Sequence, residues 1–210
     1  MRIAYCRALM CLALAGLGGC ATMSAEECAL SDWHTVGFED GSRGFTADRL
    51  GDHRRACAEH GYAPDFAAYQ AGREDGLRLY CQPARGFNVG SNGGRYLGVC
   101  PPDLEAEFLD GYQTGVELYN LRSNVNSANS RISASQNELQ RTKDLMRTKE
   151  AALIDRDTAT EERILLLADL KELAERSGEL EGEIDRLIDE RARHEERLAA
   201  YQATLAHSGY

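Results

Sequence analysis

Cysteine is the residue type with the clearest chemistry in this sequence, because seven cysteines fall within its first half. Four of them, Cys28, Cys57, Cys81 and Cys100, lie within an expected domain of about 90 residues, a density typical of small secreted domains. None of their spacings is the two to four residues of a zinc knuckle. An even number of cysteines in an oxidising compartment predicts two disulfides, which can be paired in three ways. We favour Cys28–Cys57 with Cys81–Cys100, since the second bond would close a local hairpin.

Histidines and carboxylates in the same region do not form a recognisable catalytic set. His34, His53 and His60 lie among many acids, but they have neither a His-x3-His spacing nor the pattern of a Ser-His-Asp triad. Four aspartates are better interpreted as helix caps and turn formers than as general acids: Asp32, Asp40, Asp65 and Asp103. We therefore expect no enzymatic activity, no metal and no cofactor.

The first twenty residues, MRIAYCRALMCLALAGLGGC, have the organisation of a signal peptide. Arg2 and Arg7 precede a short apolar run that is too short to span a bilayer. The run ends in Leu17-Gly18-Gly19-Cys20, which resembles the lipobox of bacterial lipoproteins. The resemblance implies cleavage before Cys20 and acylation at that residue, with residues 20–26 as a lipidated tether. Position 21 is Ala rather than Asp, which by resemblance to known lipoprotein sorting rules favours the outer membrane, facing the periplasm.

The charge of the chain argues against nucleic acid as a partner. The formal net charge is −10, and loss of the signal peptide removes two arginines and no acid. An acidic chain without a basic stripe lacks the electrostatic footprint of a nucleic-acid-binding protein. The short distance in sequence from Cys20 to Cys28 predicts that the following domain lies close to the membrane surface.

A cassette of five residues occurs three times and suggests how this domain is built. Each copy has a cysteine, an aspartate, an aromatic residue and two glycines four positions apart. The copies are Cys28, Asp32, Trp33, Gly37 and Gly41; Cys57, Asp65, Tyr69, Gly72 and Gly76; and Cys100, Asp103, Phe108, Gly111 and Gly115. Aspartate before an apolar run predicts a helix N-cap. Glycines four apart lie on one face of a helix, where each costs roughly 1 kcal/mol relative to alanine.

Two explanations account for these costly glycines. A bare helix face lets a second helix or an aromatic ring approach the backbone, which we favour. Alternatively, the face could stay open for a ligand. The residues of this candidate binding face are Trp33, Asp40, Gly41, Tyr69, Gly72, Gly76, Tyr96, Gly111 and Tyr112.

The elements that would position these residues are mainly helical. A helix is expected within 46–59, ended by Gly61, and another from about Asp65 to Tyr80. Residues 86–100, GFNVGSNGGRYLGVC, have alternating Phe87 and Val89 followed by turn-forming residues. They predict a glycine-rich β-hairpin or an extended loop.

Several motifs together resemble a known family. They are Trp33-x3-Gly37-x2-Asp40-Gly41, Cys57-x3-Gly61, Pro64-Asp65, Tyr69-x2-Gly72-x3-Gly76-Leu77, Tyr80-Cys81, Gly98-Val99-Cys100-Pro101 and Gly111-Tyr112. Over roughly residues 27–119 the chain is similar to the bacterial lipoproteins grouped as domain of unknown function 2799. That resemblance implies a location in the cell envelope, and it carries over no catalytic residue.

The remaining chain, residues 120–210, has the pattern of long helices. Small or apolar residues form a weak heptad seam that includes Leu118, Leu121, Val125, Ala128, Ile132, Ser135, Leu139, Thr142, Met146 and Leu153. A stronger seam includes Leu170, Leu173, Ser177, Leu180, Ile184, Leu187, Arg191, His194, Leu198, Tyr201 and Leu205. We favour an antiparallel coiled-coil hairpin of helices at about 117–154 and 159–206 over one continuous rod. The polar first seam leaves room for a further helix from a second copy or another protein.

The sequence thus predicts a mainly α protein with a disulfide-bonded head domain at 27–119 and a helical hairpin behind it. The favoured function is a non-catalytic outer-membrane lipoprotein that is anchored by its lipid and forms a homo-oligomer or binds an envelope partner. A periplasmic hydrolase acting on glycan or peptidoglycan, or a small-ligand receptor, is the alternative.

Overall fold

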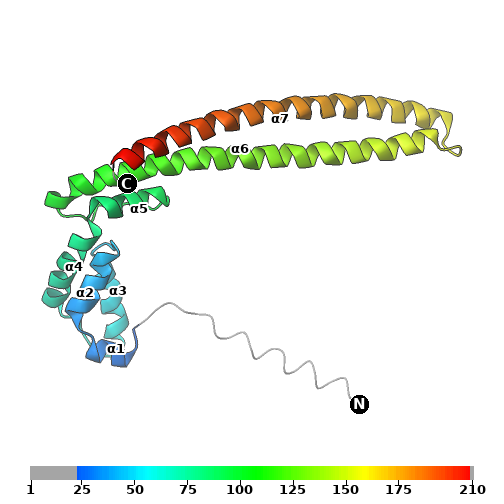
Figure 1. Cartoon of the computed structure of the whole chain (residues 1–210). Helices are drawn as coiled ribbons and strands as arrows, with labels where there is room; N and C mark the ends of the chain where they lie inside the picture. The colour runs from blue at the N-terminus through cyan, green and yellow to red at the C-terminus, as the bar shows by residue number, and fades with distance from the viewer. Residues whose placement is uncertain (1–22, 209–210) are drawn as a thin grey trace, which may run out of the picture. The chain divides into compact units, whose positions relative to one another are not determined.

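The computed structural model describes residues 23–208, and this part of the chain is mainly helical, without a strand (Figure 1). The helices are α1 (Ala25–Leu30), α2 (Trp33–Ser42), α3 (Arg49–Ala58), α4 (Phe66–Tyr80), α5 (Pro83–Ser91), α6 (Pro102–Ile154) and α7 (Thr160–Ser208). They belong to two compact units. The first unit contains residues 23–86 and 95–110, and the second contains residues 87–94 and 111–208. The expected domain boundary after residue 119 lies inside α6, within the second unit.

Aspartate caps begin two helices of the first unit, as the cassette predicts. The Asp32 carboxylate accepts a hydrogen bond from the His34 backbone N–H at 3.1 Å, and Asp65 accepts one from the Ala68 N–H at 3.0 Å. The predicted cap at Asp103 is wrong, because α6 already begins at Pro102. Proline suits the first turn of a helix, since its missing N–H has no partner there.

Both favoured disulfides are confirmed. Cys28 is bonded to Cys57, with Cα atoms 5.4 Å apart, and Cys81 is bonded to Cys100, with Cα atoms 5.6 Å apart. Cys28 and Cys57 lie before α2 and α4 respectively, whereas Cys81 and Cys100 lie before α5 and α6. Each bond therefore joins the segments that lead into two helices.

The core of the first unit forms where α2 and α4 pack together. The two helices run in the same direction, because His34 contacts Gly72 and Phe38 contacts Gly76 one turn further along both helices. Trp33 and Tyr69 form a buried cluster with the Cys28–Cys57 bond. Parallel helices need a returning segment between them, and in this unit that segment includes α3.

Of the two structures that the sequence predicts for residues 86–100, a β-hairpin or an extended loop, the β-hairpin is wrong, and a loop covers only the second part of the stretch. Residues 83–91 form α5, and only the stretch from Asn92 to Pro101 is non-helical. Pro83 occupies the first helical position of α5, where its fixed φ angle favours a helix. The alternation of Phe87 and Val89 is too short to distinguish a strand from a helix. The decisive signal is the four-residue spacing of Gly86 and Gly90.

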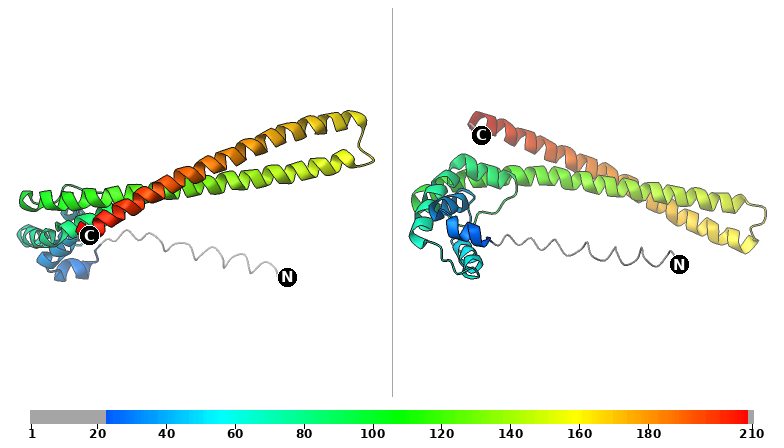
Figure 2. Two further views of the ribbon diagram at one scale, coloured as in Figure 1. Left: turned by 45° about the horizontal axis from the view of Figure 1, so that its top comes forward. Right: turned by 90° about the horizontal axis from the view of Figure 1, so that it is seen from below.

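In the second unit, α6 and α7 run alongside each other in opposite directions (Figures 1 and 2). Four ion pairs join them: Arg131–Glu190 at 3.1 Å, Glu138–Arg176 at 2.5 Å, Lys143–Glu181 at 2.7 Å and Lys149–Asp169 at 2.5 Å. The Arg163 guanidinium donates to the carbonyl oxygens of Leu153 and Asp155 at the turn between the helices. It thereby pairs carbonyls that the end of α6 leaves without helical partners.

The buried residues of α6 and α7 coincide with the two seams read from the sequence. On α6 they include Leu118, Ala128, Ile132, Ser135 and Thr142, and on α7 Ser177, Leu180, Ile184, Leu187 and Leu205. The first set contains more small and hydroxyl-bearing side chains than the second. Less apolar surface is therefore buried per residue along α6 than along α7.

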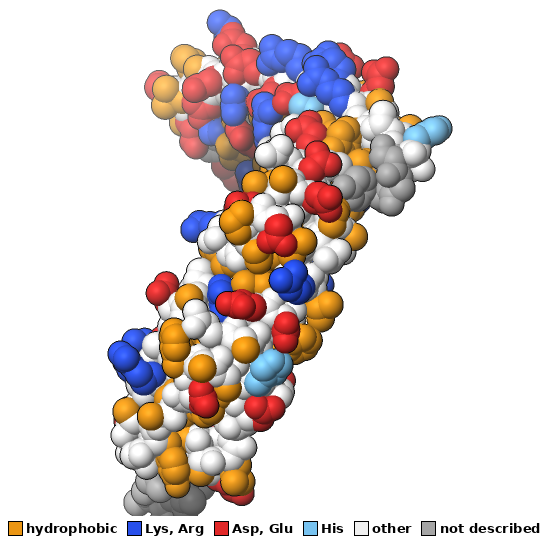
Figure 3. Space-filling model, turned by 90° about the vertical axis from the view of Figure 1, so that its left-hand side faces the viewer, with side chains coloured by type: hydrophobic (Ala, Val, Ile, Leu, Met, Phe, Trp, Pro, Cys, Tyr) orange, Lys and Arg blue, Asp and Glu red, His pale blue; other side chains and the backbone are white. Residues whose placement is uncertain are grey.

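None of the helices described in the structure is long and apolar enough to cross a membrane. The signal peptide and the acylation predicted at Cys20 lie outside the described residues. Acidic, basic and hydrophobic side chains are intermixed on the face of the molecule shown in Figure 3.

Candidate functional site

The glycines of the first unit are contact points between α2 and α4. A methyl group built on Gly72 would lie 1.8 Å from the His34 carbonyl oxygen, and one on Gly76 would lie 2.2 Å from the Phe38 carbonyl oxygen. On the facing helix, a methyl group on Gly41 would lie 2.3 Å from the Arg73 carbonyl oxygen. These glycines allow the two backbones to touch, so Gly41, Gly72 and Gly76 are covered by the opposite helix and leave no room for a ligand.

The second unit repeats this contact between α5 and α6. A methyl group on Gly90 would lie 2.2 Å from the Tyr112 carbonyl oxygen, and one on Gly115 would lie 2.3 Å from the Phe87 carbonyl oxygen. Gly93 ends α5 with a φ of 72° beneath the Tyr119 ring. In the first unit, Gly44 has a φ of 75° and lies beneath the Tyr80 ring in the same way.

These equivalent contacts reveal an internal repeat in the sequence. Residues 37–44, GFEDGSRG, and 86–93, GFNVGSNG, share the pattern Gly-Phe-x2-Gly-Ser-x-Gly. Residues 69–80, YQAGREDGLRLY, and 108–119, FLDGYQTGVELY, share aromatic-x2-Gly-x3-Gly-x2-Leu-Tyr. Each repeat is a glycine-faced pair of helices whose leading segments are joined by a disulfide. The three-fold cassette captured only part of this two-fold repeat, because it omitted Gly86 and Gly90.

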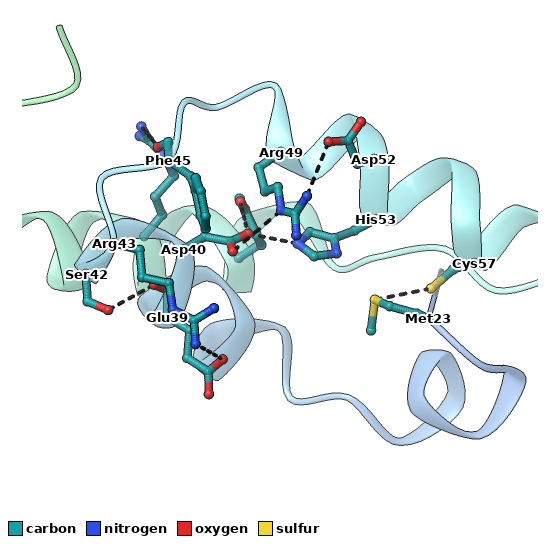
Figure 4. A network of polar contacts seen from close by, with 12 residues as sticks. Met23, Glu39, Asp40, Ser42, Arg43, Phe45, Arg49, Asp52, His53 and Cys57 are labelled. Atoms are coloured by element: carbon teal, nitrogen blue, oxygen red, sulfur yellow. Dashed lines mark hydrogen bonds and ion pairs between the residues drawn. The ribbon is translucent and has the colours of Figure 1, made fainter. Parts of the chain in front are cut away.

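A buried polar cluster distinguishes the first pair from the second (Figure 4). Asp40 of α2 is 5% exposed, and its Oδ2 accepts hydrogen bonds from His53 Nε2 at 2.8 Å and from the Tyr69 hydroxyl at 2.9 Å. Arg49 Nε lies 3.9 Å from Asp40 Oδ1. The His53 ring also lies edge-on to Trp33 and Tyr69, with centroids 6.2 and 6.0 Å away. The cluster thus joins α2, α3 and α4.

Opposing effects act on the pKa of the Asp40 carboxyl. Burial raises this pKa most, but the hydrogen bonds from His53 and Tyr69 and the positive charges nearby outweigh burial and leave the pKa below its usual value. Burial and the hydrogen bond to Asp40 raise the pKa of the Tyr69 hydroxyl well above its usual value. Asp40 is therefore ionised and Tyr69 neutral at physiological pH, so Tyr69 donates and Asp40 accepts.

Comparison with the α5–α6 pair indicates the structural role of this polar cluster. The position equivalent to Asp40 is Val89, and the position equivalent to Tyr69 is Phe108. Helix pairing through glycines therefore does not need the polar cluster. The second repeat also has no counterpart of α3, because only a short loop separates Gly93 from Cys100. The polar residues occur together with α3, and His53 and Arg49 both belong to it. The cluster holds α3 against the first pair, and the sequence-based interpretation of Asp40 as a turn former is wrong.

The remaining candidate residues do not join this cluster. The Tyr96 ring packs on Phe108 at 4.8 Å, and its hydroxyl donates to Glu105 at 2.9 Å and accepts from the Cys100 N–H at 3.0 Å. The Tyr112 hydroxyl donates to the Gly94 carbonyl oxygen at 3.1 Å, in the second unit. Gly111, which belongs to the predicted face, also lies in that unit. The residues of the predicted binding face are therefore divided between the two units.

The first unit also has a groove, but the described residues offer no group of metal-binding side chains. A shallow groove lies beside α3, lined by Leu50, Arg54 and Arg55 from that helix and by Pro64 and Phe66. Its walls carry both signs of charge. Residues 23–208 contain no cluster of three or more His, Cys, Asp or Glu side chains suited to a metal ion.

The described chain thus contains two glycine-faced helix pairs, one with its contacts in the first unit and one with its contacts in the second, and the polar cluster fixes one added helix in the first unit. Residues 32–117 match the family model described as "Protein of unknown function (DUF2799)", the family that the sequence motifs resemble. A search of curated proteins gave no significant match. A search of solved structures likewise gave none.

Proposed function

We propose that this protein is a lipid-anchored, non-catalytic component of the bacterial envelope. We propose that it binds a partner protein where α6 ends and α7 begins, around the turn between the two helices. The single observation that carries the proposal is a group of exposed aliphatic side chains around the turn between these helices. Ile154 ends α6, and Ile164, Leu165 and Leu167 lie in the first turns of α7; each is between 55% and 79% exposed. Large exposed apolar groups of this kind mark interaction sites.

The arrangement of these side chains explains why the protein's own helices do not cover them. Residues 164–167 of α7 are four consecutive aliphatics, Ile-Leu-Leu-Leu, which point to all sides of the helix. One neighbouring helix can cover only one side, and α6 takes that place. Leu145, on the last turns of α6, is a further exposed aliphatic near this end. A partner with a complementary apolar surface would remove these side chains from water, at about 25 cal/mol per Å² buried.

The two long helices suit the role of a spacer that carries this apolar end. We propose that they form an antiparallel coiled-coil hairpin, supported by the two buried seams and the four ion pairs that join them. At 1.5 Å per residue, α7 alone extends roughly 75 Å. Small and polar residues in the seam of α6 contribute little apolar burial, so much of the specificity of pairing comes from the ion pairs and the turn at Arg163.

The anchoring part of the proposal depends on the N-terminal sequence. The Leu-Gly-Gly-Cys motif that ends at Cys20 supports acylation of that residue, and Ala21 supports the outer membrane. Multiple acyl chains hold a protein stably at a bilayer, whereas a single chain does not. The buried polar cluster supports the non-catalytic part, because Asp40, His53 and Tyr69 are accounted for by holding α3.

The proposal is tested by site-specific photo-crosslinking in cells. A photoreactive residue in place of Leu165 should give a defined protein adduct, whereas the same residue in place of Glu179, also exposed on α7, should not. Changing Ile154, Ile164 and Leu167 together to serine should abolish the Leu165 adduct while leaving the protein folded by circular dichroism. An adduct that persists unchanged in this triple variant would refute the apolar end as the binding site. Labelled fatty acid should enter the wild-type chain but not Cys20→Ser.

A further inference from the structure

The point at which the N-terminal segment joins the first unit is fixed by Met23. Its side chain packs against the buried cluster of Cys28, Trp33, Cys57 and Tyr69. Met23 Sδ lies 4.0 Å from Cys57 Sγ (Figure 4), and its carbonyl oxygen lies 4.0 Å from Cys28 Sγ. The chain is therefore attached to the folded unit from Met23 onward, beside the Cys28–Cys57 bond.

Because the chain is attached at Met23, only a short segment connects Cys20 to the folded unit. Cys20 precedes Met23 by three residues, and an extended chain spans at most about 3.6 Å per residue, so their Cα atoms are at most roughly 11 Å apart. An acylated Cys20 lies at the level of the lipid headgroups. The headgroup region of one leaflet is itself about 5–8 Å thick, as the total and hydrocarbon thicknesses of a bilayer imply. The end of the unit around Met23 is thus held at the membrane surface.

Three exposed hydrophobic side chains lie in the segments next to the Cys28–Cys57 bond. Leu30, the last residue of α1 and two residues after Cys28, is 76% exposed. Tyr62, whose N–H donates to the Cys57 carbonyl oxygen at 3.0 Å, is 44% exposed. Phe66 is the first residue of α4, at the end of the helix pair that the disulfide joins, and is 60% exposed. The disulfide connects the segments that carry these three side chains.

We propose that Leu30, Tyr62 and Phe66 form a membrane-contact face that rests on the lipid surface. This inference depends on the proposed acylation of Cys20, which supplies the anchor. Aromatic and aliphatic side chains partition to the boundary between headgroups and acyl chains, where tyrosine keeps its hydroxyl in water. Three side chains would not hold a free protein at a bilayer, but the short tether keeps them there at high effective concentration.

Charge indicates which lipids this face fits. Exposed charges of both signs lie close to the disulfide: Glu26 and Glu27 on α1 and Glu59 at the end of α3 are acidic, whereas Arg54 and Arg55 on α3 are basic. Because the acids would repel an anionic surface and the arginines would repel a cationic one, the face suits zwitterionic headgroups such as phosphatidylethanolamine. The contact holds the first unit against the bilayer with α1 next to the headgroups.

The test uses the full acylated chain reconstituted into phosphatidylethanolamine–phosphatidylcholine vesicles. A diazirine-bearing residue replaces Leu30 in one variant and Phe66 in another, and phospholipid adducts are measured after irradiation. Leu79, near the opposite end of the α2–α4 pair and also exposed, is the matched control. We expect severalfold more phospholipid adduct at positions 30 and 66 than at 79.

Flotation of the vesicles separates the two proposals. If the chain does not float, Cys20 is not an effective anchor and the proposed lipoprotein is wrong. If it floats but positions 30 and 66 give no more lipid adduct than position 79, the membrane-contact face is wrong while the anchor stands. Protein adducts in place of lipid adducts at position 30 would likewise overturn the face and assign it to a partner.

Discussion

Gly72 lies so close to His34 that a methyl group on its Cα would stand 1.8 Å from the His34 carbonyl oxygen. No flexible side chain can move aside, because the atom it would meet belongs to the backbone of α2. The contact between α2 and α4 therefore depends on glycine at this position. The same relationship recurs at Gly115, where an added methyl group would stand 2.3 Å from the Phe87 carbonyl oxygen of α5.

The first prediction follows from this contact. Gly72→Ala should destabilise the protein by about 1–3 kcal/mol or more, because overpacking against an immovable backbone forces the helices apart. Gly178→Ala is the control: Gly178 is also helical, but nothing lies within 4 Å of an added methyl group. It should stabilise the protein by about 0.5–1 kcal/mol, through higher helix propensity. Urea unfolding of the oxidised proteins measures both changes, and equal effects would show that the tight contact does not exist.

The second prediction concerns the buried polar cluster. Asp40→Val leaves the Tyr69 hydroxyl buried without its acceptor, which should cost about 1–3 kcal/mol beyond the lost hydrogen bond. Adding Tyr69→Phe restores the residue pair that the second repeat has at Val89 and Phe108. The double variant should therefore be more stable than Asp40→Val alone. A double-mutant cycle from urea unfolding measures this coupling, and strictly additive effects would contradict the proposed network.

The third prediction is a dependence of stability on pH at both extremes. The pKa of Asp40 is lower in the folded protein than the unfolded value of about 3.9, so its contribution is present above that pH and is lost as pH falls through the folded pKa. The pKa of Tyr69 is raised in the folded protein, so its contribution is present below the unfolded value of about 10 and declines as pH rises above it.

The matching measurements are unfolding free energies across the pH range. The stability difference between wild type and Asp40→Asn should shrink from pH 5 to pH 2. The difference between wild type and Tyr69→Phe should shrink above pH 10. If both stability differences stay constant, from pH 5 to pH 2 for Asp40→Asn and above pH 10 for Tyr69→Phe, the pKa values of Asp40 and Tyr69 are not shifted by folding as described.

The fourth prediction concerns the disulfides. Denatured but unreduced mature protein should contain no free thiol among Cys28, Cys57, Cys81 and Cys100. Replacing Cys28 and Cys57 together by serine should cost about 2–5 kcal/mol. It should also free Met23 and α1 from the core, so limited proteolysis should cut before α2 in this variant only. Two or more free thiols in the wild-type protein would contradict the pairing.

Local signals in the sequence predicted much of the fold. Asp32 and Asp65 precede apolar helix starts, and a cap forms wherever a carboxylate can reach a free N–H group. The end of α6 at Ile154 and the start of α7 at Thr160 lie within a residue of the expected positions, because the two heptad seams change phase between them.

Two parts of the fold could not be predicted in the same way. Residues 86–91 have too few apolar positions for periodicity to separate a helix from a strand, and only comparison with 37–42 identifies Gly90 as a helix contact. The Asp40–His53 bond joins residues 13 apart through α3. Its formation depends on how α3 folds back over α2, and this tertiary arrangement leaves no local sequence pattern.

The last prediction separates the coiled-coil hairpin from a continuous rod. Labels on ketone-bearing residues at Asn137 of α6 and Gly178 of α7 avoid the native disulfides and lie at exposed positions. These positions flank the Glu138–Arg176 ion pair, so dipolar spectroscopy should report a short separation in one chain. A continuous helix would place them roughly 60 Å apart at 1.5 Å per residue. Dilution with unlabelled protein is the control, because a distance within one chain survives it and a distance between chains is lost. A distribution centred near 60 Å would disprove the hairpin and, with it, an apolar end formed by both Ile154 and Leu165.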